Sequence, residues 1–245
     1  MSFRDELIAR AVEQWEKFGK DLDRNDKFID PNGNTTTNDK TDGVPNRRKE
    51  TVEPFASRVA NYWLSIPSQQ YNDLVRKYAK AKGKLDGTID LAWSAAFISY
   101  CMQMAGAGSS FPYSSGHAAW MVQSIKNRTS GKLKASLVGF RLGEIPLEPG
   151  DLIARPREAG VTYDNAVKKA WFISHSDIVV EVDKANKVAH VIGGNVGQSV
   201  SKAKVTIDSD GKLDDPDGWM VHIQNNISLK AAPLVALSTS EAKVG

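Results

Sequence analysis

The sequence predicts an α+β protein in which N-terminal helices, one of them central and buried, pack on an antiparallel sheet. Three observations support this prediction. Apolar residues recur at helical spacing through much of the first half, and the stretch 88–106 is apolar around its whole circumference. The second half reads as short strands separated by turn-forming residues. At 245 residues the chain is long enough to bury one good core.

The composition is that of a globular protein and excludes several classes of function. Hydrophobic residues make up 41% of the chain, and 32 basic residues nearly balance 29 acidic ones, which argues against nucleic acid as the main partner. A single cysteine, Cys101, excludes an intramolecular disulfide framework and a cysteine-cluster zinc site. The four histidines show no short metal-ligand spacing, so we expect neither metal nor cofactor.

Targeting signals are also missing from the sequence. Acidic residues occupy the N-terminal region where a signal peptide has an apolar run, and no stretch reaches the roughly 18 apolar residues of a membrane span. We therefore expect a protein made in the cytoplasm, without a transmembrane segment. Delivery to the periplasm or to a target cell would need a non-classical route.

Helices are expected through the first half of the chain, with one polar interruption. Residues 4–18 carry apolar side chains at helical spacing, as do 52–66 and 68–82, which Pro67 separates. Residues 19–50 are rich in Asn, Asp, Gly and Thr, which predicts a flexible polar insert.

The expected domain organisation follows from these segments. We expect an N-terminal helix plus insert at 1–54, one main domain at 55–230 and a flexible tail at 231–245.

The stretch 88–106 is expected to be the central helix. Thr88 and Asp90 are candidate N-caps, and Gly106 is a natural stop. If Asp90 is the cap, Ser94 lies in the first turn, near the positive end of the helix dipole. Alternatively, Ser94 is only a hydroxyl satisfied by the preceding turn.

The second half is expected to form the sheet. Ser114 or Ser115 can cap a short helix that carries His117, and residues 155–170 read as a polar excursion between strands. The expected strands are 137–142, 151–154, 171–183, 187–195, 200–207 and 219–224.

A hairpin joins the strands 171–183 and 187–195. If its turn centres on Ala185, Val182 faces Val188 and His175 faces Asn195. Since strand side chains alternate, Asp177 shares the face of His175. Ser94, His175 and Asn195 together would supply a nucleophile, a base and an orienting group. Alternatively, His175 and Asn195 merely satisfy each other at a strand end.

An ordered set of motifs resembles a known group of proteins. The motifs are WSAAFISY, FPYSSGH, PGDLI, SHSDIVVEV and VIGGNVGQSV, and they span roughly residues 55–225. They resemble a poorly characterised bacterial branch that is similar to the papain-like NlpC and CHAP cell-wall hydrolases. The resemblance implies a papain-like fold and cleavage of amide bonds in peptidoglycan stem peptides.

The resemblance also implies roles for individual residues. Ser94 takes the position of the nucleophile, His175 that of the base and Asn195 that of the third catalytic residue. Asp177 is an alternative orienting group, and His117 is a candidate for substrate binding or an alternative base. Trp93, directly before the nucleophile position, is a further candidate for substrate binding.

One departure from the pattern concerns the nucleophile. Serine stands at position 94 where the hydrolases have cysteine, and serine does not ionise readily. The chain is then a true serine variant, a binding protein on an inactive scaffold, or a chain in which a natural cysteine was replaced. Cys101, seven residues further on, is expected to pack in the core, and the alternative is that Cys101 is the nucleophile.

The function expected from these observations is hydrolysis of peptidoglycan through a Ser94-linked acyl-enzyme. The alternatives are a non-catalytic module that binds wall fragments or a partner protein, and an ester or lipid acyl hydrolase. The expected partners are peptidoglycan or its fragments, with a secretion system or an immunity protein as further candidates.

Overall fold

The computed structural model describes residues 2–22, 27–29, 35–37, 49–214 and 217–228. The helices are α1 (Phe3–Lys17), α2 (Phe55–Leu64), α3 (Asp73–Lys82), α4 (Ser94–Met104), α5 (Ala118–Thr129) and α6 (Tyr163–Lys169). The strands are β1 (Asp21–Leu22), β2 (Lys27–Ile29), β3 (Thr35–Thr37), β4 (Leu137–Phe140), β5 (Leu152–Pro156), β6 (Ser174–Asp183), β7 (Val188–Val196), β8 (Ser199–Thr206) and β9 (Val221–Asn225). The protein is therefore α+β, as the sequence predicts.

Seven strands form one sheet in the order β1-β8-β7-β6-β5-β9-β4. The expected sheet was wholly antiparallel, but β1 runs parallel to β8, so the sheet is mixed. This edge strand comes from the segment expected to be a flexible insert. Asp21 holds it in place by accepting hydrogen bonds from Ser199 and Lys49. Residues 23–26, 30–34 and 38–48 of that segment, and the tail 231–245, lie outside the described residues.

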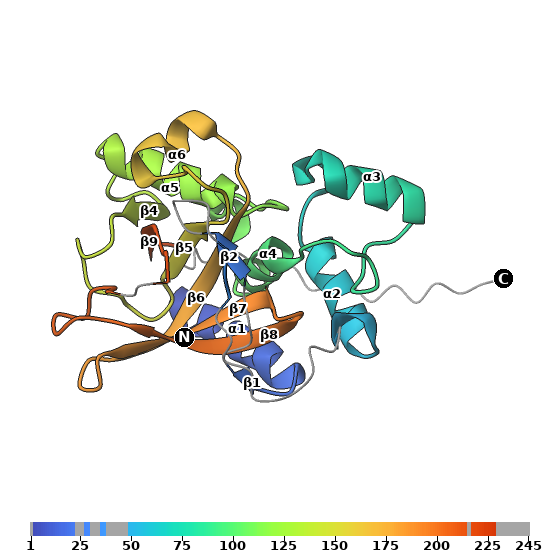
Figure 1. The fold of residues 1–245 in the computed structure, drawn as a ribbon, viewed down its shortest axis with the longest axis horizontal. Helices are drawn as coiled ribbons and strands as arrows, with labels where there is room; N and C mark the ends of the chain where they lie inside the picture. Colours follow the sequence, from blue (N-terminus) through green and yellow to red (C-terminus); the bar gives the residue numbers. More distant parts are fainter. Residues whose placement is uncertain (1, 23–26, 30–34, 38–48, 215–216, 229–245) are drawn as a thin grey trace.

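Two apolar cores lie on opposite faces of the sheet. The larger core joins Ile178 of β6 and Ile192 of β7 to the helices, including Phe97 of α4. The smaller core contains their strand neighbours Val179 and Val191. Since successive strand residues point to opposite faces, helix α4 covers the face of Ile178 and Ile192. Figure 1 shows α4 near the centre of the molecule, with α5 and α6 on one side and α2 and α3 on the other.

The N-terminal helix α1 is attached to the sheet by a buried polar network. Arg4 donates hydrogen bonds to Asp151 Oδ1 and to the carbonyl oxygens of Pro149 and Asn225. The same carboxylate accepts from the backbone of Asn225 and lies 2.8 Å from His222 Nε2. Because every partner is satisfied, this buried carboxylate fixes α1 against β5 and β9.

Helix α4 begins later than expected. Its first residue is Ser94, and its N-cap is Trp93 rather than Thr88 or Asp90. The reason is local, because Asp86 accepts hydrogen bonds from the backbone and hydroxyl of Thr88 and holds that segment in a turn. Ser94 therefore occupies the N-terminal end of the helix itself. Gly106, with a positive φ of 88°, follows the helix end as expected.

Two other helices differ from the expectation. Helix α5 begins at Ala118 with His117 as N-cap, and not after Ser114 or Ser115. Ser115 instead accepts a hydrogen bond from the backbone of Asn72, which ties this loop to the start of α3. Helix α6 lies in the segment expected to be a polar excursion, where Thr162 and Asn165 form a capping box.

The β6–β7 hairpin has two registers. Near the turn, Val182 pairs with Ala189, so the expected pairing of Val182 with Val188 is wrong by one residue. A bulge between Val179 and Glu181 absorbs the difference, and Val179 then pairs with Val191 in the expected register. The expected register therefore holds only at the end of the hairpin away from the turn.

Candidate functional site: a buried serine–histidine pair

The candidate nucleophile Ser94 makes a hydrogen bond to His117. Ser94 Oγ lies 2.7 Å from His117 Nε2, and both side chains are buried. Ser94 is the first residue of α4, and His117 is the N-cap residue of α5. Two helix N-termini thus bring a hydroxyl and an imidazole together, at the distance that proton transfer from a nucleophile to a base needs.

The expected pairing of Ser94 with His175 is therefore not the one observed. His175 pairs with Arg155 of β5, and its ring lies beside the ring of His117 and not against the Ser94 hydroxyl. His117 comes from the connection between α4 and α5 and reaches the hydroxyl instead. The assignment of His117 as an alternative base is the one that this geometry favours.

The protonation state of His117 follows from its surroundings. Burial lowers the pKa of His117 well below its usual value, and the nearby His175 and the positive charge of Arg157 act in the same direction. The imidazole is therefore neutral at pH 7 and able to accept a proton. Its Nδ1 atom is buried and has no hydrogen-bond partner among the described residues. When Nε2 accepts the serine proton, this Nδ1 carries the imidazole hydrogen.

His175 and Asp177 form a second pair beside the first. His175 Nε2 lies 2.7 Å from Asp177 Oδ1, and the ring centroids of His175 and His117 are 5.4 Å apart. The contact agrees with the expectation that His175 and Asp177 share one face of β6. The polar groups follow the order Ser94, His117, His175, Asp177, with the carboxylate one imidazole away from the base.

Glycine makes room for this second pair. A Cβ atom on Gly193 would lie 2.0 Å from Asp177 Oδ1, and one on Gly194 would lie 2.4 Å from Phe97 Cβ. The Gly-Gly sequence of β7 thus admits the Asp177 carboxylate on one face of the sheet and helix α4 on the other.

Asn195 does not complete the site as expected. It adopts a positive φ of 58° where the pairing of β7 with β8 is irregular. No hydrogen bond joins it to His175 within the described part of the chain. Because the backbone leaves the extended conformation at this residue, strand alternation does not predict where the Asn195 side chain lies.

Two further residues belong to the core. Trp93 is buried and packs against Phe18 and Tyr62 at centroid distances of 5.8 and 5.7 Å, and it does not line the cavity at Ser94. Cys101 is also fully buried, which raises the pKa of its thiol far above the usual range. A thiol that stays protonated is a poor nucleophile, in agreement with the expected packing role.

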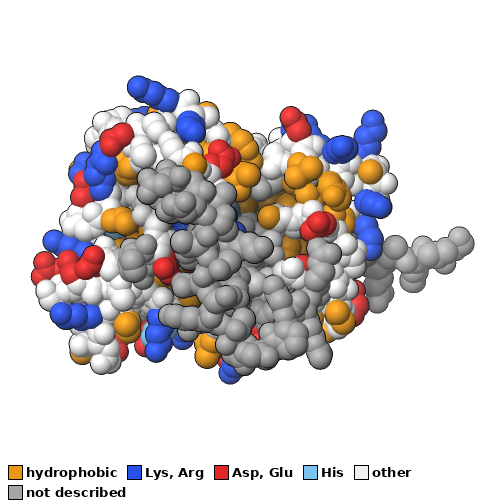
Figure 2. Space-filling view, in the orientation of Figure 1, with side chains coloured by type: hydrophobic (Ala, Val, Ile, Leu, Met, Phe, Trp, Pro, Cys, Tyr) orange, Lys and Arg blue, Asp and Glu red, His pale blue; other side chains and the backbone are white. Residues whose placement is uncertain are grey.

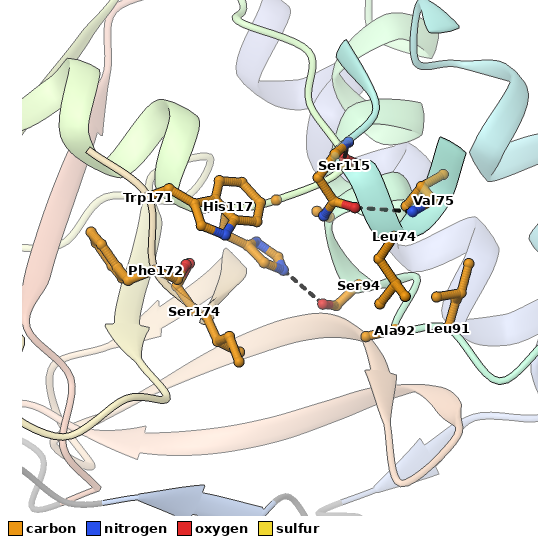
Figure 3. A pocket seen from close by; sticks show the side chains of 14 residues that line it. Leu74, Val75, Leu91, Ala92, Ser94, Ser115, His117, Trp171, Phe172 and Ser174 are labelled. Atoms are coloured by element: carbon orange, nitrogen blue, oxygen red, sulfur yellow. Dashed lines mark hydrogen bonds between the residues drawn. The ribbon is translucent and has the colours of Figure 1, made fainter. Parts of the chain in front are cut away.

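The serine–histidine pair opens into a cavity of about 200 Å³. Figure 3 shows the Ser94–His117 hydrogen bond with Leu74 and Leu91 on one side and Trp171 on the other. The walls come from α3, the start of α4, the segment before α5 and the segment before β6. Sequence reasoning missed Leu74 and Trp171, because apolar residues on separate segments carry no local motif.

The N-terminus of α4 also faces this cavity, since Ser94 and Ala95 line it. The first amides of a helix have no intrahelical acceptor, and Trp93 supplies no side-chain cap. These amides carry the partial positive charge of the helix dipole, so they are suited to stabilise an oxyanion that forms on a carbonyl attacked by Ser94.

Within the described ranges, no group of three His, Cys, Asp or Glu side chains is arranged to hold a metal ion. None of the helices in those ranges is both long and apolar enough to cross a membrane.

The model of one protein family, described as an uncharacterized protein conserved in bacteria (DUF2272), matches residues 52–228. The chain belongs to this family. No curated protein and no solved structure matches the chain. The region matched by the DUF2272 family includes Ser94, His117, His175 and Asp177, whereas α1 and β1 precede it.

Proposed function

We propose that this DUF2272 protein is an acyl hydrolase in which Ser94 is the nucleophile and His117 the general base. The hydrogen bond of 2.7 Å between Ser94 Oγ and His117 Nε2, at a cavity beside the start of α4, carries the proposal. A serine hydroxyl needs such a base, because its own pKa is too high for it to ionise.

The reaction would proceed through an acyl-enzyme. Ser94 Oγ attacks the carbonyl carbon and passes its proton to His117 Nε2, while the carbonyl oxygen becomes an oxyanion near the first amides of α4. His117 then gives the proton to the departing alcohol or amine, and the acyl group stays on Ser94. Water attacks the ester, His117 takes its proton, and the carboxylic acid is released as the Ser94 hydroxyl is restored.

We assign His175 and Asp177 a positioning role in this reaction. Asp177 Oδ1 lies 2.7 Å from His175 Nε2, and the His175 ring packs beside the ring of His117. The pair would therefore hold the imidazole of His117 in place against Ser94 without touching substrate.

The substrate predicted by the resemblance is an amide bond of peptidoglycan, on a papain-like fold. That substrate, the fold assignment, a secretion-system or immunity partner and delivery outside the cytoplasm all remain proposals based on the resemblance. A serine nucleophile suits esters at least as well as amides, so the proposed reaction is acyl transfer to water from either class of bond.

A second candidate function is a non-catalytic binding module. The observation that favours it is the unpartnered Nδ1 of His117, because a general base is ordinarily oriented by an acceptor at that atom. The two candidates differ in whether Ser94 ever forms a covalent bond.

Covalent labelling distinguishes them. A fluorophosphonate reacts with an activated serine, which forms an O–P bond and releases fluoride. We expect mass spectrometry to find the phosphonyl group on Ser94, and p-nitrophenyl acetate to be hydrolysed. Ser94→Ala should lower that hydrolysis at least about a thousandfold, and His117→Asn about 100- to 10,000-fold.

The matched controls are Ser124→Ala and His190→Asn. Ser124 is a buried serine that bonds within α5, and His190 lies beside Glu181, so neither lines the cavity. Both variants should keep labelling and turnover. If folded wild-type protein acquires no label and turns over no ester, and purified sacculi release no new amino groups, catalysis by Ser94 is wrong.

A further inference from the structure

The cavity beside Ser94 has an apolar character that extends to the protein surface. Its 14 lining residues include no Asp, Glu, Lys or Arg, and its one titratable side chain, His117, is held neutral by burial. Apolar side chains supply much of the wall, among them Leu74, Leu91 and Phe172. An ionised group placed there would lose its hydration without gaining a countercharge from a side chain of the wall.

Three large apolar side chains of the wall are also exposed to solvent. Leu74, Trp171 and Ile173 keep 55%, 47% and 60% of their surface accessible. Figure 2 shows hydrophobic side chains gathered on the side of the molecule where α3 lies. Scattered exposed apolar residues need no explanation, but three at the walls of one cavity indicate an apolar ligand.

The position of Trp171 is defined by a close contact with the backbone. A Cβ atom on Gly116 would lie 1.9 Å from Trp171 Cη2. The indole therefore lies directly against the residue that precedes His117. Because φ of Gly116 is not in the left-handed region, steric room for the indole is what this glycine provides.

We propose that this cavity binds the acyl side of the substrate and selects an uncharged, apolar acyl chain. The inference rests on the proposed function, because it takes Ser94 to attack the carbonyl at the end of that chain. The stem peptides predicted by the resemblance carry ionised carboxylates, for which the cavity has no partner among its lining residues. The substrate class that fits is therefore an ester or amide of an apolar carboxylic acid.

A series of p-nitrophenyl esters tests the preference of the cavity for a longer acyl chain. From acetate to hexanoate, we expect kcat/KM to rise about fourfold for each methylene until the cavity is filled. Trp171→Ala and Leu74→Ala should each reduce the rise in kcat/KM per methylene, because each removes part of the apolar cavity wall. Gly116→Ala should act in the same direction by displacing the indole. Leu64→Ala is the matched control, since Leu64 is exposed on α2 and does not line the cavity.

A pair of esters of equal length tests the charge. The p-nitrophenyl ester of pentanoate should be hydrolysed at least about tenfold faster than the mono-ester of glutarate, in which a carboxylate replaces the terminal methyl group. Equal or faster hydrolysis of the glutarate ester would overturn the inference.

The outcomes separate this inference from the proposed function. Turnover that needs Ser94 but does not change with chain length, or a gain per methylene unchanged in Trp171→Ala and Leu74→Ala, would overturn the acyl-chain site alone. The absence of Ser94-dependent turnover with every ester and of Ser94 labelling would overturn the proposed function, and this inference with it.

Discussion

His117 is the residue whose chemistry decides how the site works. It is buried, neutral and in contact with Ser94, so it is a base that is ready to accept a proton. The same burial makes its charged form costly, which ties activity and stability to the pKa of this one imidazole.

The low pKa of His117 predicts the direction of both pH dependences. In the unfolded chain the imidazole takes up a proton near pH 6.5, whereas in the folded protein it stays neutral to lower pH. Unfolding therefore binds a proton below pH 6.5, and stability falls as the pH is lowered, by up to about 1.4 kcal/mol per pH unit. We expect the acid limb of kcat/KM also to lie below pH 6.5.

Urea unfolding between pH 5 and pH 8, for wild type and His117→Asn, measures how the free energy of unfolding depends on pH. In the variant, the free energy of unfolding should depend less steeply on pH below 6.5, by the equivalent of about one bound proton. His190→Asn is the control, because His190 is partly exposed and outside the site. An unchanged slope in His117→Asn would contradict a depressed pKa for this residue.

At the scale of elements, the sequence predicted the members of the site better than their pairing. Ser94 was recognisable because one small polar residue stands near the start of an apolar stretch, and His117, His175 and Asp177 were all candidates. The pairing of Ser94 with His117 is not predictable from local pattern, because it depends on how the N-termini of α4 and α5 meet in space. The parallel pairing of β1 with β8 joins residues far apart in the chain, so no local pattern predicts it.

The two glycines of β7 predict a test of the His175–Asp177 pair. Gly193→Ala would place a methyl group 2.0 Å from Asp177 Oδ1, so the carboxylate must move away from His175. We expect kcat/KM to fall about 10- to 100-fold, because small displacements of catalytic groups have effects of that size. A p-nitrophenyl ester assay measures it.

A double-mutant cycle shows whether the effect passes through Asp177. In an Asp177→Ala background, Gly193→Ala should lower kcat/KM no further, since the displaced group is gone. Gly194→Ala, which meets Phe97 instead, should keep its full effect in both backgrounds. If Gly193→Ala, like Gly194→Ala, keeps its full effect in the Asp177→Ala background, a positioning role for His175 and Asp177 is contradicted.

At the scale of the whole molecule, the site depends on segments that are distant in sequence. The cavity wall combines α3, the start of α4, the segment before α5 and the segment before β6. Beneath it, Phe18 after α1 packs against Tyr62 of α2 and against Trp93, the residue next to Ser94. The region matched by the family model starts at residue 52, yet α1 shares one core with it.

This shared core predicts that α1 is part of the folding unit. Leu7 is fully buried in the larger core, so Leu7→Ala should lower the free energy of unfolding by about 2–5 kcal/mol. Leu64→Ala removes the same atoms from a side chain that is 79% exposed. It should change the free energy of unfolding by less than about 0.5 kcal/mol. Urea unfolding followed by tryptophan fluorescence measures both.

A fragment of residues 52–228 lacks α1 and β1, and we expect it to lose the cooperative transition. If Leu7→Ala behaves like Leu64→Ala and the fragment unfolds cooperatively with wild-type stability, α1 is an appendage and the family region folds alone.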